Sequence, residues 1–237
     1  MKNQIKYSLA GFCMGVAELI PGISGSTIAV IFKIYPNLMQ ILSQLKLKNL
    51  TLNIRSLSEI FQLKLSLPLI FSMIIAVMLC SRVINYLLTN YEELFLSSLG
   101  LLMIFLSAFI IKFFKDIFND KKLIIFLFFG AGIGFGLQEL SVNSGNISAL
   151  YIFLCGMLAF SFFLIPGISG SAMLVVLGIY GPIIQAVATL DFNLLFPFAL
   201  GCLISLLVLP KALLSIYSSH ELNLMHIFSG LILSSGI

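Results

Sequence analysis

Charged residues are scarce in this chain: they make up 9% of its 237 residues, whereas 60% of the residues are hydrophobic. So few charges could not cover the surface of a soluble domain, which excludes that class of protein. The mean hydropathy of +1.14 agrees, and several apolar runs approach the roughly 20 residues that a helix needs to cross a bilayer. We therefore expect an all-α polytopic membrane protein, with residues 1–237 in a single membrane domain.

Cysteine and histidine are also scarce, and neither is clustered. The cysteines stand singly in apolar segments, without a C-x-x-C pair or a histidine at ligand spacing, so we interpret them as small buried hydrophobic residues. We therefore predict no metal site and no cofactor. The four cysteines are Cys13, Cys80, Cys155 and Cys202.

Enzyme chemistry is disfavoured by the same shortage. Residues 22–25 read GISG, a G-x-S-G pattern, but the two histidines, His220 and His226, fall in a polar stretch that we expect to be a cytoplasmic loop. A serine nucleophile would therefore lack its base. A lipid phosphatase would need a set of arginines and a nucleophilic histidine, which are missing as well. The expected class is a transporter rather than an enzyme.

An octapeptide is present twice without a difference. LIPGISGS occupies residues 19–26 and again residues 164–171, 145 positions later. A gapless alignment of 11–42 with 156–187 adds further identities, so chance repetition is excluded. We expect repeat 1 at about 7–111 and repeat 2 at about 147–237, linked by a span at 123–138. The further identities pair Gly11 with Gly156, Val30 with Val175, Ile34 with Ile179, Tyr35 with Tyr180 and Gln40 with Gln185.

Each octapeptide is predicted to break a helix. It stands between two apolar arms, 7–20 and 26–40 in the first copy and 150–165 and 171–190 in the second. Proline ends the preceding ladder of hydrogen bonds, glycines permit unusual backbone angles, and serines can cap the helix that follows. We therefore expect a helix, a break and a second helix in each copy. The helix-breaking residues are Pro21 and Pro166.

The distribution of basic residues favours a re-entrant hairpin over a kinked span. If 7–40 crossed the membrane once, the basic residues at the N-terminus would lie opposite those of 41–64, against the positive-inside rule. A hairpin places both segments, and 112–122, in the cytoplasm. Three spans then separate the two copies, as in an inverted repeat with two facing broken hairpins and a site near the bilayer midplane. The continuous spans are expected at 66–88, 94–111, 123–138 and 194–216.

The residues at the breaks are candidates for an anion site. Helices that begin near Ser24–Ser26 and Ser169–Ser171 would present unpaired N–H groups, partial positive charge and hydroxyls. The alternative is that PGISGS is only a packing joint between half-helices. Four glycines in the span at 123–138 are expected to serve close helix packing; they are Gly130, Gly132, Gly134 and Gly136.

Glu18 is the charged residue most difficult to explain by packing. It lies three residues before the first break, at a depth where charge is costly, and its counterpart in the second copy is Phe163. We leave open a proton carrier, a cation ligand and a structural pair with Arg82. Lys33 and Lys211 could reach the cytoplasmic interface with their long side chains.

Four segments resemble the bacterial polyprenyl-phosphate translocase family: GVAELIPGISGSTIAVIFKIY, LIPGISGSAMLVVLGIYGPIIQA, SSLGLLM and FSGLILSSG. The resemblance covers nearly the whole chain. It implies a flippase that returns undecaprenyl phosphate from the outer to the inner leaflet of the bacterial cytoplasmic membrane, for recycling in the synthesis of peptidoglycan and other cell-wall polymers. Ser26 stands where we expect glycine in the family motif. By motif, the substrate-binding residues are Gly22, Ser24, Gly25, Ser26, Thr27, Gly167, Ser169, Gly170 and Ser171, with Glu18 as a further functional position.

An inorganic-anion channel or exchanger is the main alternative, because it could use the same helix N-termini. A lipid carrier needs a groove open to the bilayer, whereas an ion path should be closed to lipid. The expected partners are polyprenyl phosphate and the membrane, with the N-terminus cytoplasmic and no nucleic acid. Coupling to protons or sodium through Glu18, and assembly into a homo-oligomer, stay open.

Overall fold

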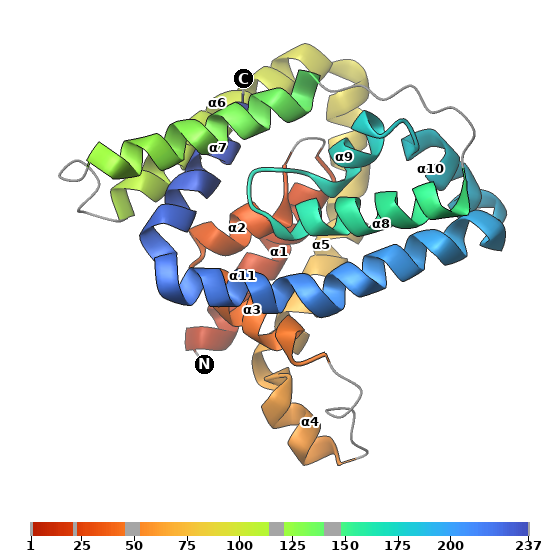
Figure 1. The fold of residues 1–237 in the computed structure, drawn as a ribbon, viewed down its shortest axis with the longest axis horizontal. Coiled ribbons are helices and arrows are strands. Elements are labelled where there is room, and N and C mark those ends of the chain that lie inside the picture. Colours follow the sequence, from red (N-terminus) through yellow and green to blue (C-terminus); the bar gives the residue numbers. More distant parts are fainter. Residues whose placement is uncertain (1, 21–22, 46–52, 114–120, 140–147, 237) are drawn as a thin grey trace.

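The computed structural model describes residues 2–20, 23–45, 53–113, 121–139 and 148–236, and Figure 1 shows their arrangement. Eleven helices and no strands make up this part of the chain. Three of the helices are long and apolar enough to cross a bilayer. The prediction of an all-α polytopic membrane protein is confirmed.

Both copies of the octapeptide break a helix where the sequence predicts it. One helix ends just before the octapeptide or at its first residue, and the next begins at the second glycine, Gly25 or Gly170. The first copy consists of α1 (Lys2–Glu18), α2 (Gly25–Ile31) and α3 (Tyr35–Ser43), and the second of α8 (Ala149–Leu164), α9 (Gly170–Val176) and α10 (Tyr180–Thr189).

Each copy contains a second break that the sequence analysis missed. The arms 26–40 and 171–190, expected to be single helices, are each divided, and in the second copy α9 and α10 are bent by 118°. The same Schellman turn ends α2 and α9: Lys33 and Gly178 have φ of 53° and 67°, and the next N–H groups, of Ile34 and Ile179, donate to the carbonyls five residues earlier. The expectation of one continuous outer arm is wrong because this turn satisfies the carbonyls at the end of a seven-residue helix.

The predicted spans at 66–88 and 94–111 lie in α5 (Leu63–Asn90) and α6 (Glu92–Phe113). The third lies in α7 (Lys121–Glu139), whose described apolar part, Leu123–Leu137, is shorter. A short helix, α4 (Ile54–Ile60), precedes α5.

The fourth predicted span forms part of α11 (Phe192–Ser235), which continues beyond 216 through a kink at His220. The expectation that both histidines lie in a polar loop is wrong. His220 is at the kink of this helix, and His226 is buried in the segment after it. Across the kink, the Tyr217 hydroxyl donates a hydrogen bond to Glu221 Oε1 at 2.7 Å.

The two repeats pack in the same way. The first helix of each copy lies along the long helix that follows the hairpin, so that α1 packs on α5 and α8 packs on α11. Glycines permit these close contacts: Gly11 meets the backbone of Leu69, and Gly156 that of Phe198. The last part of α11 then packs between α6 and α7. In Figure 1 the segment of α11 beyond its kink runs toward these two helices.

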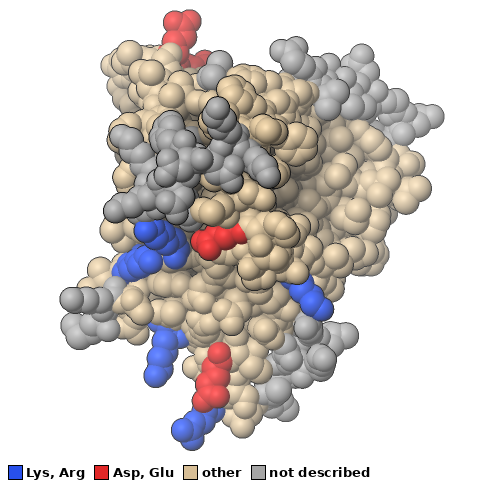
Figure 2. All heavy atoms as spheres, turned by 60° about the vertical axis from the view of Figure 1, so that its left-hand side comes forward, with Lys and Arg blue, Asp and Glu red and all other residues tan. Residues whose placement is uncertain are grey.

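The glycines of α7 divide into two pairs. Gly130 and Gly134 lie against Ile227 and Ser234 of α11, as the packing hypothesis predicts, whereas a Cβ atom on Gly132 or Gly136 would meet nothing within 4 Å. The outward faces of α5, α6, α7 and α11 carry exposed large hydrophobic residues. Figure 2 shows one face of the molecule, on which charged side chains are few and most of the described surface is uncharged. Such a surface suits contact with lipid.

Candidate functional site

The two breaks are in direct contact, although about 140 residues separate them in the chain. The Gly167 N–H donates to the Thr27 hydroxyl at 2.9 Å, between buried groups. The Ser24 hydroxyl donates to the Phe163 carbonyl at 3.4 Å. Backbone groups freed by a broken helix must find partners inside a membrane protein, and here side chains of the first copy supply partners for backbone groups of the second.

A third cross-repeat bond lies beside the second joint of repeat 1. The Tyr35 hydroxyl donates to the Leu164 carbonyl at 3.2 Å, at the end of α8. Tyr35 is 1% exposed and its ring packs edge-on against Phe228. Its counterpart Tyr180 is 42% exposed. The contact between the copies is therefore not symmetric, despite the symmetry of the sequence motif.

Glu18, Ser24, Gly25 and Ser26 of the first break are hydrogen-bonded to one another. The Gly25 N–H, at the start of α2, donates to Glu18 Oε1 at 2.7 Å. Ser24 caps α2 by accepting from the Ser26 N–H at 3.3 Å, and the two serine hydroxyls lie 2.7 Å apart. All three site residues from Ser24 to Ser26, and Thr27, are buried. A carboxylate thus occupies the donor that the sequence analysis assigned to a substrate anion.

Two predicted residues of this break, Pro21 and Gly22, lie outside the described residues. Arg82 is exposed on α5, and within the described parts of the chain no ion pair joins it to Glu18. The acceptor role of Glu18 toward the backbone of Gly25 was not among the alternatives considered from the sequence.

The second break lacks the corresponding carboxylate, because Phe163 takes the place of Glu18. Ser169 begins α9 without a side-chain capping bond, and its hydroxyl lies 2.7 Å from that of Ser171. Gly170 and Ser169 are buried, and Ser171 is exposed. The amides at this helix start therefore have no acidic side chain in the place where Glu18 stands in the first copy.

A pocket of about 110 Å³ adjoins the second break, several times the ~30 Å³ that one water occupies in the liquid. Gly167, Ile168 and Ser169 line it on one side. Across from them, α7 and the end of α11 contribute Gly134, Ser234 and Ser235, which the sequence analysis did not assign to a site. The pocket combines hydroxyl groups with an apolar wall, also lined by Leu137, Ala172, Met173 and Val176.

Gly167 cannot be replaced without moving the backbone of α11. Its φ of 91° is unfavourable for other residues, and a Cβ atom would lie 2.5 Å from the Ile232 nitrogen. Pro166 beside it is buried. These two residues fix the turn that presents the Gly167 N–H to Thr27.

Groups of three or more histidine, cysteine or acidic side chains that could hold a metal are absent from the described residues. All four cysteines are free thiols, and Cys155 is buried. The polar groups described at the two breaks are hydroxyls and backbone amides, together with the carboxyl group of Glu18.

The fold and the site define a polytopic helical membrane protein whose core is a duplicated broken helix. Residues 14–236 match the family model described as VCA0040-like, undecaprenyl phosphate translocase-like, so the chain belongs to that family. It is 26% identical over 216 residues to the polyprenyl-phosphate transporter of Vibrio cholerae, covering 86% of this chain and 67% of the relative. It is 28% identical over 246 residues to the Staphylococcus aureus polyprenyl-phosphate transporter, covering 96% and 83%. No solved structure matches it.

Proposed function

We propose that this chain moves undecaprenyl phosphate, or a closely related polyprenyl phosphate, from the outer to the inner leaflet of the bacterial cytoplasmic membrane, so that the lipid carrier is used again in cell-wall polymer synthesis. Two relatives named polyprenyl-phosphate transporters support the substrate class. The pocket at Ser169 combines hydroxyls with an apolar wall, which suits a lipid phosphate. The apolar outer faces would be shared by an inorganic-anion channel or exchanger and do not separate the two functions.

The phosphate headgroup binds at the second break in this proposal. The observation that carries it is the pocket beside Ser169, next to a helix start that has no carboxylate of its own. Phosphate oxygens accept hydrogen bonds from hydroxyls and backbone amides, and charge makes these bonds about twice as strong as neutral ones. Ser169, which lines the pocket, is the expected donor, with the Gly170 amide and the Ser171 hydroxyl next to it in the chain. Ser234 and Ser235 also line the pocket, and their hydroxyls would have to exchange backbone carbonyls for the phosphate.

The first break becomes available to phosphate only when Glu18 leaves Gly25. A proton or a sodium ion on Glu18 would weaken its bond to that amide, because the bond then loses its charge assistance. Inward movement of a negative headgroup is opposed by an inside-negative potential by about 2.3 kcal/mol per charge per 100 mV, and a co-transported cation offsets this. Glu18 is therefore the proposed coupling residue.

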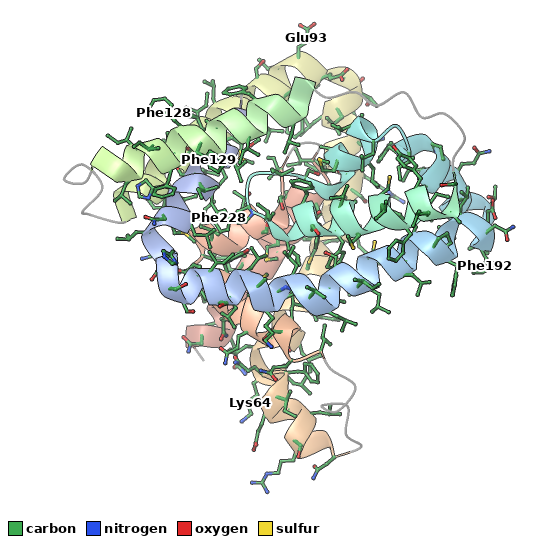
Figure 3. All side chains as sticks on the ribbon, viewed as in Figure 1. Lys64, Glu93, Phe128, Phe129, Phe192 and Phe228 are labelled. Carbon is green, nitrogen blue, oxygen red and sulfur yellow. The ribbon has the colours of Figure 1, made fainter. Side chains whose placement is uncertain are left out.

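The orientation in the membrane is part of the proposal. The N-terminus and residues 41–64 lie in the cytoplasm, and the start of α6, with Glu93, lies outside. Figure 3 places Lys64 and Glu93 at opposite ends of the molecule. In a cysteine-free background, an impermeant thiol reagent added outside should label Glu93→Cys and not Lys64→Cys. The reverse result would invert the topology and the proposed direction.

The binding proposal is tested by Gly170→Pro in proteoliposomes that contain a polyprenyl phosphate, with headgroup translocation as the readout. Proline removes the Gly170 N–H and fixes its backbone, so we expect translocation to fall at least tenfold. Gly181→Pro is the matched control, because Pro36 already occupies the equivalent position of repeat 1 and a Cβ atom there meets nothing within 4 Å. Equal activity of both variants would refute the site. Uptake of chloride or inorganic phosphate without lipid movement would favour the channel or exchanger.

A further inference from the structure

A second pocket, of about 200 Å³, lies between the α2–α3 joint and α11. Its polar lining includes Lys33 at the joint, Tyr35 at the start of α3, and Tyr217 and Glu221 on either side of the α11 kink. Its apolar lining includes Ile31, Ile110 and Met225. The pocket therefore offers one cation, one anion and hydroxyl groups next to an apolar wall, which is the lining that an amphiphile requires.

The two pockets lie at opposite ends of the last segment of α11. Met225 lines one and Ser235 the other, roughly 15 Å apart at 1.5 Å per residue. In the proposed orientation α7 ends outside and α6 ends inside, so the pocket at Gly134 is nearer the outer surface and the pocket at Ile110 is nearer the cytoplasm. Tyr35, which lines the inner pocket, is hydrogen-bonded to Leu164, just before the second break.

Lys33 has a backbone conformation that lysine rarely adopts. Its φ of 53° lies in the left-handed region, and the equivalent residue of repeat 2 is Gly178, which takes the same conformation without strain. The Schellman turn at the end of α2 requires this conformation at position 33. Here the strain places an exposed ammonium-bearing side chain at the pocket.

We propose that this second pocket binds the phosphate headgroup at the cytoplasmic end of the path, with Lys33 as its cation and the apolar wall against the first isoprene unit. The proposal rests on the proposed function. Glu221 opposes a phosphate here by like charge, and its carboxylate also accepts the Tyr217 hydroxyl at 2.7 Å. The two charged residues therefore have opposite effects: Lys33 holds the headgroup, and Glu221 limits its affinity so that the headgroup can leave.

Two engineered cysteines at equivalent positions, one at each pocket, can distinguish binding at this site from binding at the outer one. Ile31 and Val176 are equivalent positions of the two repeats, each is half-buried, and each lines one pocket. With the native cysteines replaced by alanine, Ile31→Cys and Val176→Cys are alkylated with a maleimide in the presence of geranyl phosphate, geraniol or inorganic phosphate. We expect geranyl phosphate to slow alkylation at both positions and geraniol at neither. If inorganic phosphate protected the cysteines as well as geranyl phosphate does, the pocket would be a site for free anions, and the proposal that it binds a lipid headgroup would be overturned.

Substitutions of Lys33 and Glu221 then test their proposed roles, with alkylation of Ile31→Cys as the readout. Lys33→Gly adopts the conformation of Gly178, so the fold is kept while the cation is lost; protection should need about tenfold more geranyl phosphate, as expected for one charge-assisted hydrogen bond. In Glu221→Gln, protection of the cysteine at position 31 should need less geranyl phosphate than in the protein that keeps Glu221. Lys211→Gln, on an exposed residue of α11 outside the pocket, should change nothing.

The outcomes distinguish the two proposals. Protection at position 176 without protection at position 31 overturns the inner site and leaves the proposed function standing. Protection at neither position contradicts both. Protection at position 31 that Lys33→Gly leaves unchanged overturns the role of Lys33 and with it the inner phosphate site.

Discussion

The two copies of LIPGISGS have the same sequence but different surroundings. In the first, Glu18 accepts from Gly25 and the serines are buried. In the second, Phe163 stands in the place of Glu18, Ser169 is also buried but borders a pocket, and Ser171 is exposed. Proline and glycine set the break itself, whereas the residue at position 18 or 163 decides whether an acidic side chain accepts from the amide at the start of the next helix. A duplicated motif therefore does not imply a duplicated site.

Phe163→Glu should have the largest effect, because it gives the second copy the carboxylate of the first. A Cβ atom on Gly170 would lie 3.0 Å from the Phe163 Cβ, so the side chain at 163 is beside the start of α9. The new carboxylate should accept from the Gly170 N–H and exclude phosphate, lowering translocation in proteoliposomes at least tenfold, or about 1.4 kcal/mol. Phe163→Leu is the control for lost aromatic packing. If Phe163→Glu transports like Phe163→Leu, the two breaks do not differ as described.

Glu18→Gln is the converse change. An amide accepts a weaker hydrogen bond than a carboxylate and carries no titratable proton, so the first break should open without a cation. We expect headgroup translocation to lose its response to an imposed pH or sodium gradient. Retention of full translocation together with full sensitivity to both gradients would show that coupling lies elsewhere.

Thr27→Val tests the contact between the two breaks. Valine has the shape of threonine but cannot accept from the buried Gly167 N–H, which should cost about 1–3 kcal/mol of stability. The melting temperature of the purified protein should fall, and Thr27→Ser, which keeps the acceptor, should restore most of the loss. An unchanged melting temperature in Thr27→Val would show that the bond between Gly167 and Thr27 does not stabilise the contact between the breaks.

The serine substitutions should have the smallest effects and should differ between the copies. Ser169→Ala removes one donor from the pocket while the backbone amides remain, so binding of geranyl phosphate should weaken a few-fold, as expected for about 0.5–1.5 kcal/mol. Ser24→Ala removes a buried cap and should lower stability more than binding. If Ser24→Ala weakened binding and Ser169→Ala did not, the open site would be the first break.

The sequence predicted the all-α membrane fold and both PGISGS breaks, because proline, glycine and the repeat are local signals. It missed the joints at Lys33 and Gly178. Glycine before IYGP in the second copy is a signal of a helix end, but the first copy has lysine there, and nothing local predicts that lysine will adopt a left-handed conformation. The ranges of α5 and α6 were predictable because apolar runs set their length, whereas α11 continues well beyond the predicted end at 216.

The site was only partly predictable. The motif residues from Ser24 to Thr27 and from Gly167 to Ser171 do lie together, but their hydrogen bonds to Glu18, Phe163 and each other depend on packing between distant segments. Ser234 and Ser235 carry no motif, and they reach the pocket only because α11 continues beyond its kink to pack against α7. Non-local packing decides these features.

The most direct test of the account is a structure of the protein in a lipid nanodisc with a short-chain polyprenyl phosphate bound. The account predicts the phosphate within hydrogen-bonding distance of Ser169 or the Gly170 amide, the isoprenoid chain leaving the pocket sideways into the bilayer, and Glu18 still on Gly25. A phosphate held at Gly25 in place of Glu18 with the second break empty, or an anion enclosed in a cavity closed to lipid, would contradict it.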